Sequence, residues 1–175
     1  MAKIKIGDQQ INFDLPGVDG INHNIGDNQN IKVVIFSCNH CPYAQAWEDR
    51  IIQIQSDFSE NIQVIMISSN DADQFPDDSF GKMKERANEK RFNFPYLYDQ
   101  SQKIATIYGA ERTPEVFVFD SMGKLRYHGT IDDNYENESE AMKFFLRDAI
   151  EKLIKGENPD PSSTEPVGCS IKWKN

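Results

Sequence analysis

The stretch "IKVVIFSCNHCPYAQAWEDR", residues 31–50, carries two of the three cysteines of this 175-residue chain. Residues 32–36 form a β-branched apolar run without polar alternation, which predicts a strand buried on both faces of a sheet. Between residues 47 and 58, large apolar side chains recur with the spacing of one helix face. Cys38 and Cys41 therefore lie where a buried strand passes into an amphipathic helix.

The Cys-x-x-Cys spacing leaves three interpretations open, namely a redox couple, half of a metal site, or two buried thiols. Three cysteines are too few for a disulfide scaffold. In a reducing compartment, such a pair is more often catalytic or metal-binding than structural.

The composition restricts the partners and the compartment. The chain has 19 basic and 28 acidic side chains and a net charge of −9, so it repels nucleic acid and anionic lipid. It has no apolar run long enough for a membrane helix, and its first residues do not form a secretory leader. We expect a cytoplasmic protein that binds neither nucleic acid nor membranes.

The rest of the chain alternates predicted strands and helices. We expect the last helix, at 139–155, to be capped by Ser139 and to bury Met142, after a solvated acidic loop at 132–140. The other expected elements are a strand at 62–68, a helix near 79–91, a strand or extended segment at 94–99, a helix at 101–110 and a hairpin at 115–130. This order predicts a mixed sheet covered on both faces.

The position of the cysteines suggests their roles. A helix N-terminus near Cys38 would lower the pKa of its thiol, which makes it the expected nucleophile, with Cys41 as the more buried resolving thiol. Pro42 suits a first helical turn because it lacks an N–H group. A protonated His40 would favour the Cys38 thiolate and make the disulfide more oxidising, whereas the alternative for His40 is a solvent-facing polar residue.

At this point a family resemblance is evident. The strand, "CNHC" and helix resemble the thioredoxin superfamily, and the motif is similar to the Cys-x-His-Cys sites of disulfide isomerases and periplasmic oxidases. Residues 11–36 and 92–129 resemble the redoxin branch, which includes the peroxiredoxins. The resemblance implies a thioredoxin-like three-layer α/β/α fold with a central mixed sheet and a redoxin-type N-terminal extension. It also implies a cis peptide bond at Thr113-Pro114, facing the sulfurs.

The chain departs from these families at specific positions. Lys32 occupies the place of the buried aspartate of thioredoxins proper, so proton handling must differ or use another group. Ser37 replaces the tryptophan before the first cysteine. The peroxiredoxin pattern Pro-x-x-x-Thr/Ser-x-x-Cys is absent, because Val34 and Cys38 occupy its first two places when it is counted back from Cys41.

We divide the chain into a thioredoxin-like domain, residues 1–156, and a C-terminal tail, residues 157–175. The tail ends in apolar residues, so we expect it to dock on the domain with Ile171 and Trp173 on one buried face. Cys169 is either a buried structural thiol or a third thiol near the other two.

The sequence thus predicts an enzyme, a thiol–disulfide oxidoreductase without cofactor or metal. Its partners would be disulfide or thiol substrates, protein or small molecule, and a separate electron donor. We expect Asn39 and Arg112 to support the site, although Arg112 is equally suited to a surface salt bridge. The alternatives are a peroxiredoxin-like thiol peroxidase and a non-enzymatic redox-sensing or zinc-binding module.

Overall fold

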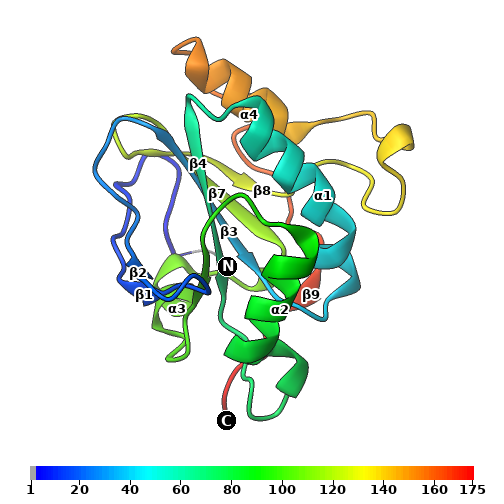
Figure 1. Cartoon of the computed structure of the whole chain (residues 1–175). Helices are drawn as coiled ribbons and strands as arrows, with labels where there is room; N and C mark the ends of the chain where they lie inside the picture. Colours follow the sequence, from blue (N-terminus) through cyan, green and yellow to red (C-terminus); the bar gives the residue numbers. More distant parts are fainter. Residues whose placement is uncertain (1–2) are drawn as a thin grey trace.

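A five-stranded mixed sheet forms the centre of the molecule (Figure 1). The computed structural model describes residues 3–175. In the sheet order β5-β4-β3-β7-β8, the strands β3, β4 and β5 are parallel, and β7 and β8 run antiparallel to their neighbours. The strands are β3 Ile31–Ser37, β4 Ile62–Ser68, β5 Tyr96–Tyr98, β7 Glu115–Phe119 and β8 Leu125–Gly129.

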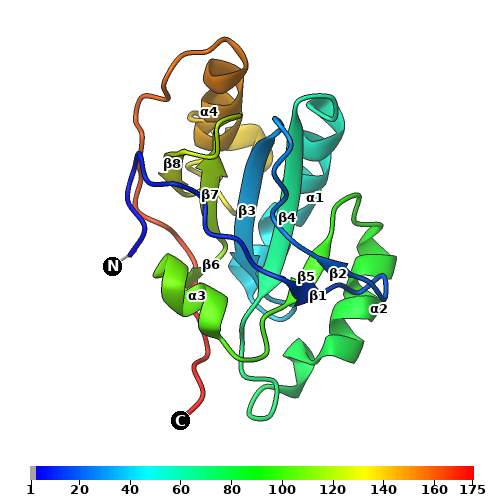
Figure 2. The same cartoon turned by 90° about the vertical axis from the view of Figure 1, so that its left-hand side faces the viewer.

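Helices cover both faces of the sheet and make three layers (Figure 2). One face packs against α1 (Pro42–Asp57), α2 (Phe80–Lys90) and α4 (Phe145–Ile154). The other face is covered by α3 (Lys103–Tyr108) and by the N-terminal segment. The thioredoxin-like α/β/α fold expected from the sequence is therefore confirmed.

The apolar run of β3 feeds two separate cores because successive side chains of a strand point to opposite faces. Val33 and Ile35 pack on the side of α1, whereas Val34 and Phe36 pack on the side of α3. All seven residues of β3 are buried. The absence of polar alternation in the sequence follows from this double coverage.

Short elements complete the fold. The N-terminal extension contains an antiparallel pair, β1 (Leu15–Pro16) and β2 (Asn22–His23). Two 3-10 turns, η1 (Pro76–Asp78) and η2 (Glu138–Glu140), lie in the long loops. A second short antiparallel pair joins β6 (Arg112–Thr113) to β9 (Cys169–Ser170) in the C-terminal tail.

The tail lies along the body of the molecule from α4 to the start of α1 (Figures 1 and 2). Thr164 bonds the backbone of His128 and the hydroxyl of Tyr127, and it packs so closely on Gly129 that a Cβ there would lie 2.0 Å from its hydroxyl oxygen. Farther on, Ile171 is buried in the α3 core. Trp173 is 41% exposed, so the expected burial of both apolar side chains holds only for Ile171.

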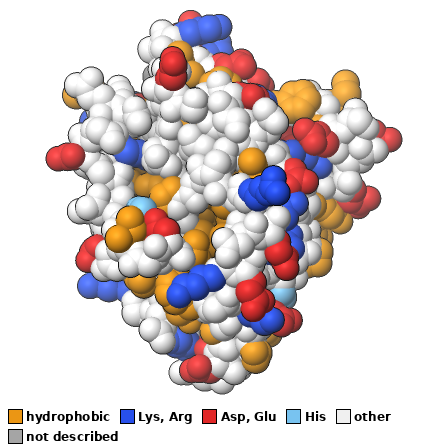
Figure 3. Space-filling view, in the orientation of Figure 1, with side chains coloured by type: hydrophobic (Ala, Val, Ile, Leu, Met, Phe, Trp, Pro, Cys, Tyr) orange, Lys and Arg blue, Asp and Glu red, His pale blue; other side chains and the backbone are white. Residues whose placement is uncertain are grey.

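The last helix begins later than its sequence pattern predicts. It starts at Phe145, so Ser139 does not cap it, and Met142 is 81% exposed instead of buried. The loop before it is held by Asp132, which accepts bonds from Trp47 Nε1 (2.9 Å) and Arg50 (2.7 Å). This anchor ties the start of the loop to α1, and the loop contains the 3-10 turn η2 before α4 begins. Hydrophobic side chains are visible on this loop in Figure 3.

Among the described residues, no helix has the length and apolar content needed to cross a bilayer.

Candidate active site

The two motif cysteines lie at the C-terminal end of β3 and the start of α1. Pro42 occupies the first turn of α1, as predicted. The N-cap residue is Cys41 and not Cys38, which corrects the expected position of the helix end. Both thiols are buried, Cys38 at 2% exposure and Cys41 at 0%, so the expected difference in depth is small.

The Cys41 sulfur has three close neighbours. The Cys38 thiol hydrogen-bonds to it, the Thr113 carbonyl oxygen lies 3.2 Å away, and Cys169 Sγ lies 2.8 Å away. The Cys38 sulfur itself lies 3.6 Å from Thr113 Oγ1. All three cysteines of the chain therefore share one cluster beside Thr113, and all three are free thiols.

Within this cluster, a thiolate is most stable on Cys41. The hydrogen bond from Cys38, with a smaller contribution from Cys169, lowers the pKa of Cys41 to about 4 against the opposing effect of burial. The same hydrogen bond, burial and the nearby carboxylate of Asp78 raise the pKa of Cys38. This reverses the shift expected for Cys38, because the helix N-terminus lies at Cys41 and because a buried carboxylate faces Cys38.

Asp78 holds the two residues between the cysteines. Its side chain is fully buried and accepts bonds from the backbone N–H of Asn39 (2.8 Å) and from the side-chain amide of Asn70 (2.9 Å). The Asn39 side chain in turn accepts a bond from the hydroxyl of Tyr96 and donates one to the carbonyl of Asp77. The Cys-x-x-Cys turn is thus fixed from the side of η1.

His40 is paired with Asp78 instead of being a free surface residue. Its Nδ1 forms an ion pair with the Asp78 carboxylate, its ring stacks on Phe75, and its side chain is 30% exposed. One ligand atom each from Cys38, His40 and Asp78 lie within 4.8 Å of one another, which is a spacing that a metal ion can bridge.

The peptide bond between Thr113 and Pro114 is cis, as the family resemblance implies. Glu115 holds this turn, because one carboxylate oxygen accepts the backbone N–H groups of Glu111 (2.7 Å) and Arg112 (2.8 Å). The other oxygen bonds His128 Nε2 at 2.7 Å.

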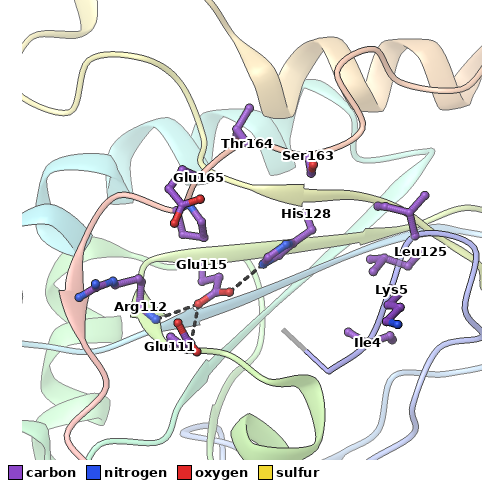
Figure 4. Close-up of a pocket in the computed structure, with 12 residues that line it drawn as sticks. Ile4, Lys5, Glu111, Arg112, Glu115, Leu125, His128, Ser163, Thr164 and Glu165 are labelled. Atoms are coloured by element: carbon purple, nitrogen blue, oxygen red, sulfur yellow. Dashed lines mark hydrogen bonds and ion pairs between the residues drawn. The ribbon is translucent and has the colours of Figure 1, made fainter. Parts of the chain in front are cut away.

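Figure 4 shows this Glu115–His128 pair on the wall of a cavity of about 680 Å³. The cavity is lined by the tail, β8 and the N-terminal segment and contains no cysteine. The three cysteines therefore lie outside this cavity. Arg112 is exposed and lies beside Cys169, where its charge helps to lower the pKa of that thiol.

Asp78, the buried carboxylate beside Cys38, was not predicted from the sequence. Lys32 does replace the thioredoxin aspartate, and its ammonium bonds Asn28 at 2.7 Å, away from the sulfurs. Asp78, which comes from the polar stretch after β4, instead places a buried carboxylate beside Cys38. The only sequence signal was a Pro-Asp-Asp turn in a loop that otherwise resembles a solvated surface.

Two solved structures resemble the chain over nearly its full length. An uncharacterised conserved protein from Geobacillus kaustophilus is 34% identical, with a TM-score of 0.91 over 98% of this chain and 93% of its own. A hypothetical protein from Sinorhizobium meliloti 1021 is 30% identical, with a TM-score of 0.91 over 98% of this chain and 96% of its own.

A more distant structure supports the fold alone. It is a secreted disulfide oxidoreductase from Mycobacterium tuberculosis, 17% identical, with a TM-score of 0.56 over 65% of this chain and 79% of its own. A comparison with curated proteins gave no significant match.

The sequence profile of the AhpC/TSA family matches residues 6–128, which include β3, the Cys-x-x-Cys turn, the cis-proline turn and β8. The matched range thus contains the elements that form the sheet and hold Cys38 and Cys41. The chain therefore belongs to the AhpC/TSA family, within the redoxin branch of the thioredoxin superfamily.

Proposed function

We propose that this protein is a thiol–disulfide oxidoreductase that uses Cys38 and Cys41 as its redox couple. The observation that carries the proposal is the placement of both sulfurs at the start of α1 beside Thr113, with Cys38 Sγ 3.6 Å from its hydroxyl oxygen and Cys41 Sγ 3.2 Å from its carbonyl oxygen. In this environment the pKa of Cys41 is lowered to about 4, so a thiolate is present at neutral pH. Membership of a thiol-dependent family supports the same chemistry.

The first step needs a thiolate on Cys38, the cysteine that directly follows β3. A proton shift along the hydrogen bond, from Cys38 to Cys41, provides it. The Cys38 thiolate then attacks a substrate disulfide, forms a mixed disulfide and releases one substrate thiolate.

The second step closes the protein disulfide. Cys41 loses its proton, attacks Cys38 Sγ and releases the second substrate thiolate. The substrate gains two electrons and the protein loses two, which leaves a Cys38–Cys41 disulfide. Thr113, whose hydroxyl and carbonyl oxygens lie beside the two sulfurs, holds the reacting groups in place.

The direct test is reduction of insulin disulfides with dithiothreitol as electron donor. The native protein should accelerate the reaction, and Cys38→Ser and Cys41→Ser should each abolish the acceleration. Ser56→Ala on the exposed side of α1 is the matched control and should keep it. If the native, fully reduced protein gives only the uncatalysed rate, and its two cysteines fail to form a disulfide in a glutathione redox titration, the proposal is wrong.

A thiol peroxidase is the second candidate, and the AhpC/TSA family match favours it. The peroxiredoxin Pro-x-x-x-Thr/Ser-x-x-Cys pattern is absent, which favours the first candidate. Peroxide consumption by the same reduced preparation decides between them. A rate above that of the Cys38→Ser/Cys41→Ser protein supports peroxidase activity.

A zinc-binding module is the third candidate because Cys38, His40 and Asp78 are close enough to share an ion. Zinc titration of the reduced protein, followed by equilibrium dialysis, tests it. Stoichiometric binding that is lost in Asp78→Asn would favour a metal role, whereas our proposal expects no tight binding.

We further propose disulfide-containing proteins or small molecules as substrates, a separate thiol donor as reductant, and a cytoplasmic location. The negative net charge argues against nucleic acid as a partner. Cell fractionation with an antibody to the native chain tests the location, and recovery outside the cytoplasm would overturn it.

A further inference from the structure

The inference concerns Cys169, whose sulfur lies 2.8 Å from Cys41 Sγ although 128 residues separate them in the chain. A disulfide between these two thiols needs only a small closing movement, since S–S bonds are about 2.05 Å long. Cys41 thus has a cysteine partner on each side, Cys38 from its own turn and Cys169 from the tail.

Backbone pairing fixes this arrangement. In the β6–β9 pair, Thr113 stands opposite Cys169, so the residue that contacts both motif cysteines also positions the third. Gly168 is required for this approach, because a Cβ there would lie 2.1 Å from the carbonyl oxygen of Thr113.

The segment after Cys169 is also tied to the body. Ile171 is buried, and its N–H bonds the carbonyl of Glu111 at 2.9 Å. The backbone of Lys172 bonds Asp71 and the side chains of Asn70 and Gln102. Cys169 is thus held by contacts on both sides and is not on a free end.

The three thiols differ in access to solvent. Cys38 and Cys41 are buried, whereas Cys169 is partly exposed. An external thiol can therefore reach Cys169 more readily than it can reach the pair behind it.

We propose that Cys169 is a third redox-active thiol that exchanges with the Cys38–Cys41 disulfide, with Cys41 as the sulfur common to both disulfides. The Cys169 thiolate attacks Cys41 Sγ, the Cys38–Cys41 bond breaks, and Cys38 leaves as a thiolate that takes up the proton Cys169 lost. No electrons enter or leave in this exchange. A thiol reductant then attacks Cys169, releases Cys41 and, with a second equivalent, returns the protein to three thiols.

The charge on Cys41 makes the reactivity of Cys169 depend on whether the Cys38–Cys41 pair is oxidised. In the reduced protein, burial and the neighbouring Cys41 thiolate raise the pKa of Cys169 to about 11, while Lys172 and Arg112 oppose the shift. When Cys41 is bound to Cys38 it carries no charge, so one of the two causes disappears. Cys169 therefore becomes a better nucleophile once the pair is oxidised.

This inference rests on the proposed function, and the test separates the two. The full-length reduced protein and its variants are oxidised with diamide under native conditions, quenched with acid and alkylating agent, and mapped by peptide mass spectrometry. In Cys169→Ser, formation of Cys38–Cys41 tests the proposed function alone. In Cys38→Ser, we expect a Cys41–Cys169 disulfide.

The matched control moves the thiol by one position, in Cys38→Ser/Cys169→Ser/Ser170→Cys. Ser170 is exposed and points away from Cys41, so this protein should form no internal disulfide. The inference is overturned if Cys38→Ser keeps two free thiols, or pairs no faster than the control, under conditions that oxidise Cys169→Ser.

The rate at which the oxidised protein is reduced again gives a second measurement. Reduction of the oxidised protein by glutathione should be at least about tenfold slower in Cys169→Ser than in the native protein, because the accessible sulfur is missing. An equal rate would show that the reductant attacks the Cys38–Cys41 disulfide directly and would contradict the relay.

Discussion

At the scale of single residues, the chemistry of the site depends on which of the three sulfurs is a thiolate. It also depends on the Asp78 carboxylate beside Cys38. Hydrogen bonding within the sulfur cluster favours a thiolate on Cys41, while Asp78 opposes one on Cys38. His40 Nδ1 lies against the Asp78 carboxylate. Two predictions follow from this arrangement.

The first concerns stability and pH. The pKa of Cys41 is about 4 in the folded protein and near 8.5 in an unfolded chain, so the unfolded state binds more protons between these values. The stabilising effect is complete above the unfolded pKa and is lost as pH falls through the folded pKa. Between pH 5 and 8, roughly, the stability of the reduced protein should rise more steeply with pH than that of Cys41→Ser, in urea unfolding with a non-thiol reductant.

The difference between the two pH profiles isolates the contribution of Cys41. Carboxylates and histidines titrate in both proteins, so their contributions cancel in the difference. Parallel pH profiles for the two proteins would mean that Cys41 does not carry the charge.

The second prediction concerns the reduction potential. Replacing His40 by Pro removes the imidazole and the backbone N–H group that contact the Asp78 carboxylate, so that charge is less shielded beside Cys38, which disfavours the thiolate and makes the couple more reducing. Asp78→Asn should shift the potential in the opposite direction, since it removes that charge but keeps an acceptor for the Asn39 N–H group. Each tenfold change in the equilibrium with glutathione corresponds to about 30 mV. Shifts of the same sign in the two variants would refute this account.

At the scale of elements, the loop between β8 and α4 is held by one buried carboxylate. Asp132 is 4% exposed and accepts bonds from Trp47 and Arg50 on α1, and Arg50 also bonds the carbonyl of Asn134 at 2.6 Å. These contacts tie the loop that precedes α4 to α1.

The third prediction tests this anchor. Asp132→Ala leaves the buried Arg50 guanidinium without its carboxylate, so the free energy of unfolding should fall by about 3–5 kcal/mol. Glu140→Gln, at an exposed position of the same loop, should change it by less than about 0.5 kcal/mol. Both values come from denaturant unfolding of the reduced proteins. A loss below about 1 kcal/mol for Asp132→Ala would show that the loop is held by other contacts.

Local sequence patterns could be predicted, whereas the buried carboxylates Asp78 and Asp132 could not. The pattern of β3, the cysteine spacing and the helix periodicity are local, so the sheet, α1 and the placement of Cys38 and Cys41 between β3 and α1 followed from neighbouring residues. Asp78 and Asp132 lie in acidic loops, and nothing within a few positions distinguishes them from solvated carboxylates. Their partners, Asn39 and Trp47, are 39 and 85 residues away, and only the folded chain brings them together.

At the scale of the whole molecule, the C-terminal tail joins α4 to the active site across the edge of the sheet (Figure 2). It bonds β8 through Thr164 and β6 through Cys169, and its Ile171 enters the α3 core. The cysteine cluster is therefore built from both ends of the sequence.

The fourth prediction tests the dependence of the tail on Gly168. Gly168→Ala places a methyl group against the Thr113 carbonyl and should displace β9, so the amide protons of Ile171 and Lys172 should exchange with solvent at least about tenfold faster. Gly81→Ala is the control, because its Cβ meets only the Ser79 hydroxyl at 4.0 Å and an alanine favours the helix. Unchanged exchange in Gly168→Ala would mean that β9 accommodates the methyl group without separating from β6.

The pairing of β6 with β9 also sets an order of assembly during synthesis. β3, α1 and the cis-proline turn lie within the first 114 residues, so they leave the ribosome well before the segment that carries Cys169. A nascent chain thus exposes Cys41 with a single cysteine partner, and only the finished chain can cover it with the second. β9, which closes the sulfur cluster, is made after every strand of the five-stranded sheet, so a chain truncated before Cys169 would retain that sheet but would have the sulfur chemistry of a two-cysteine protein.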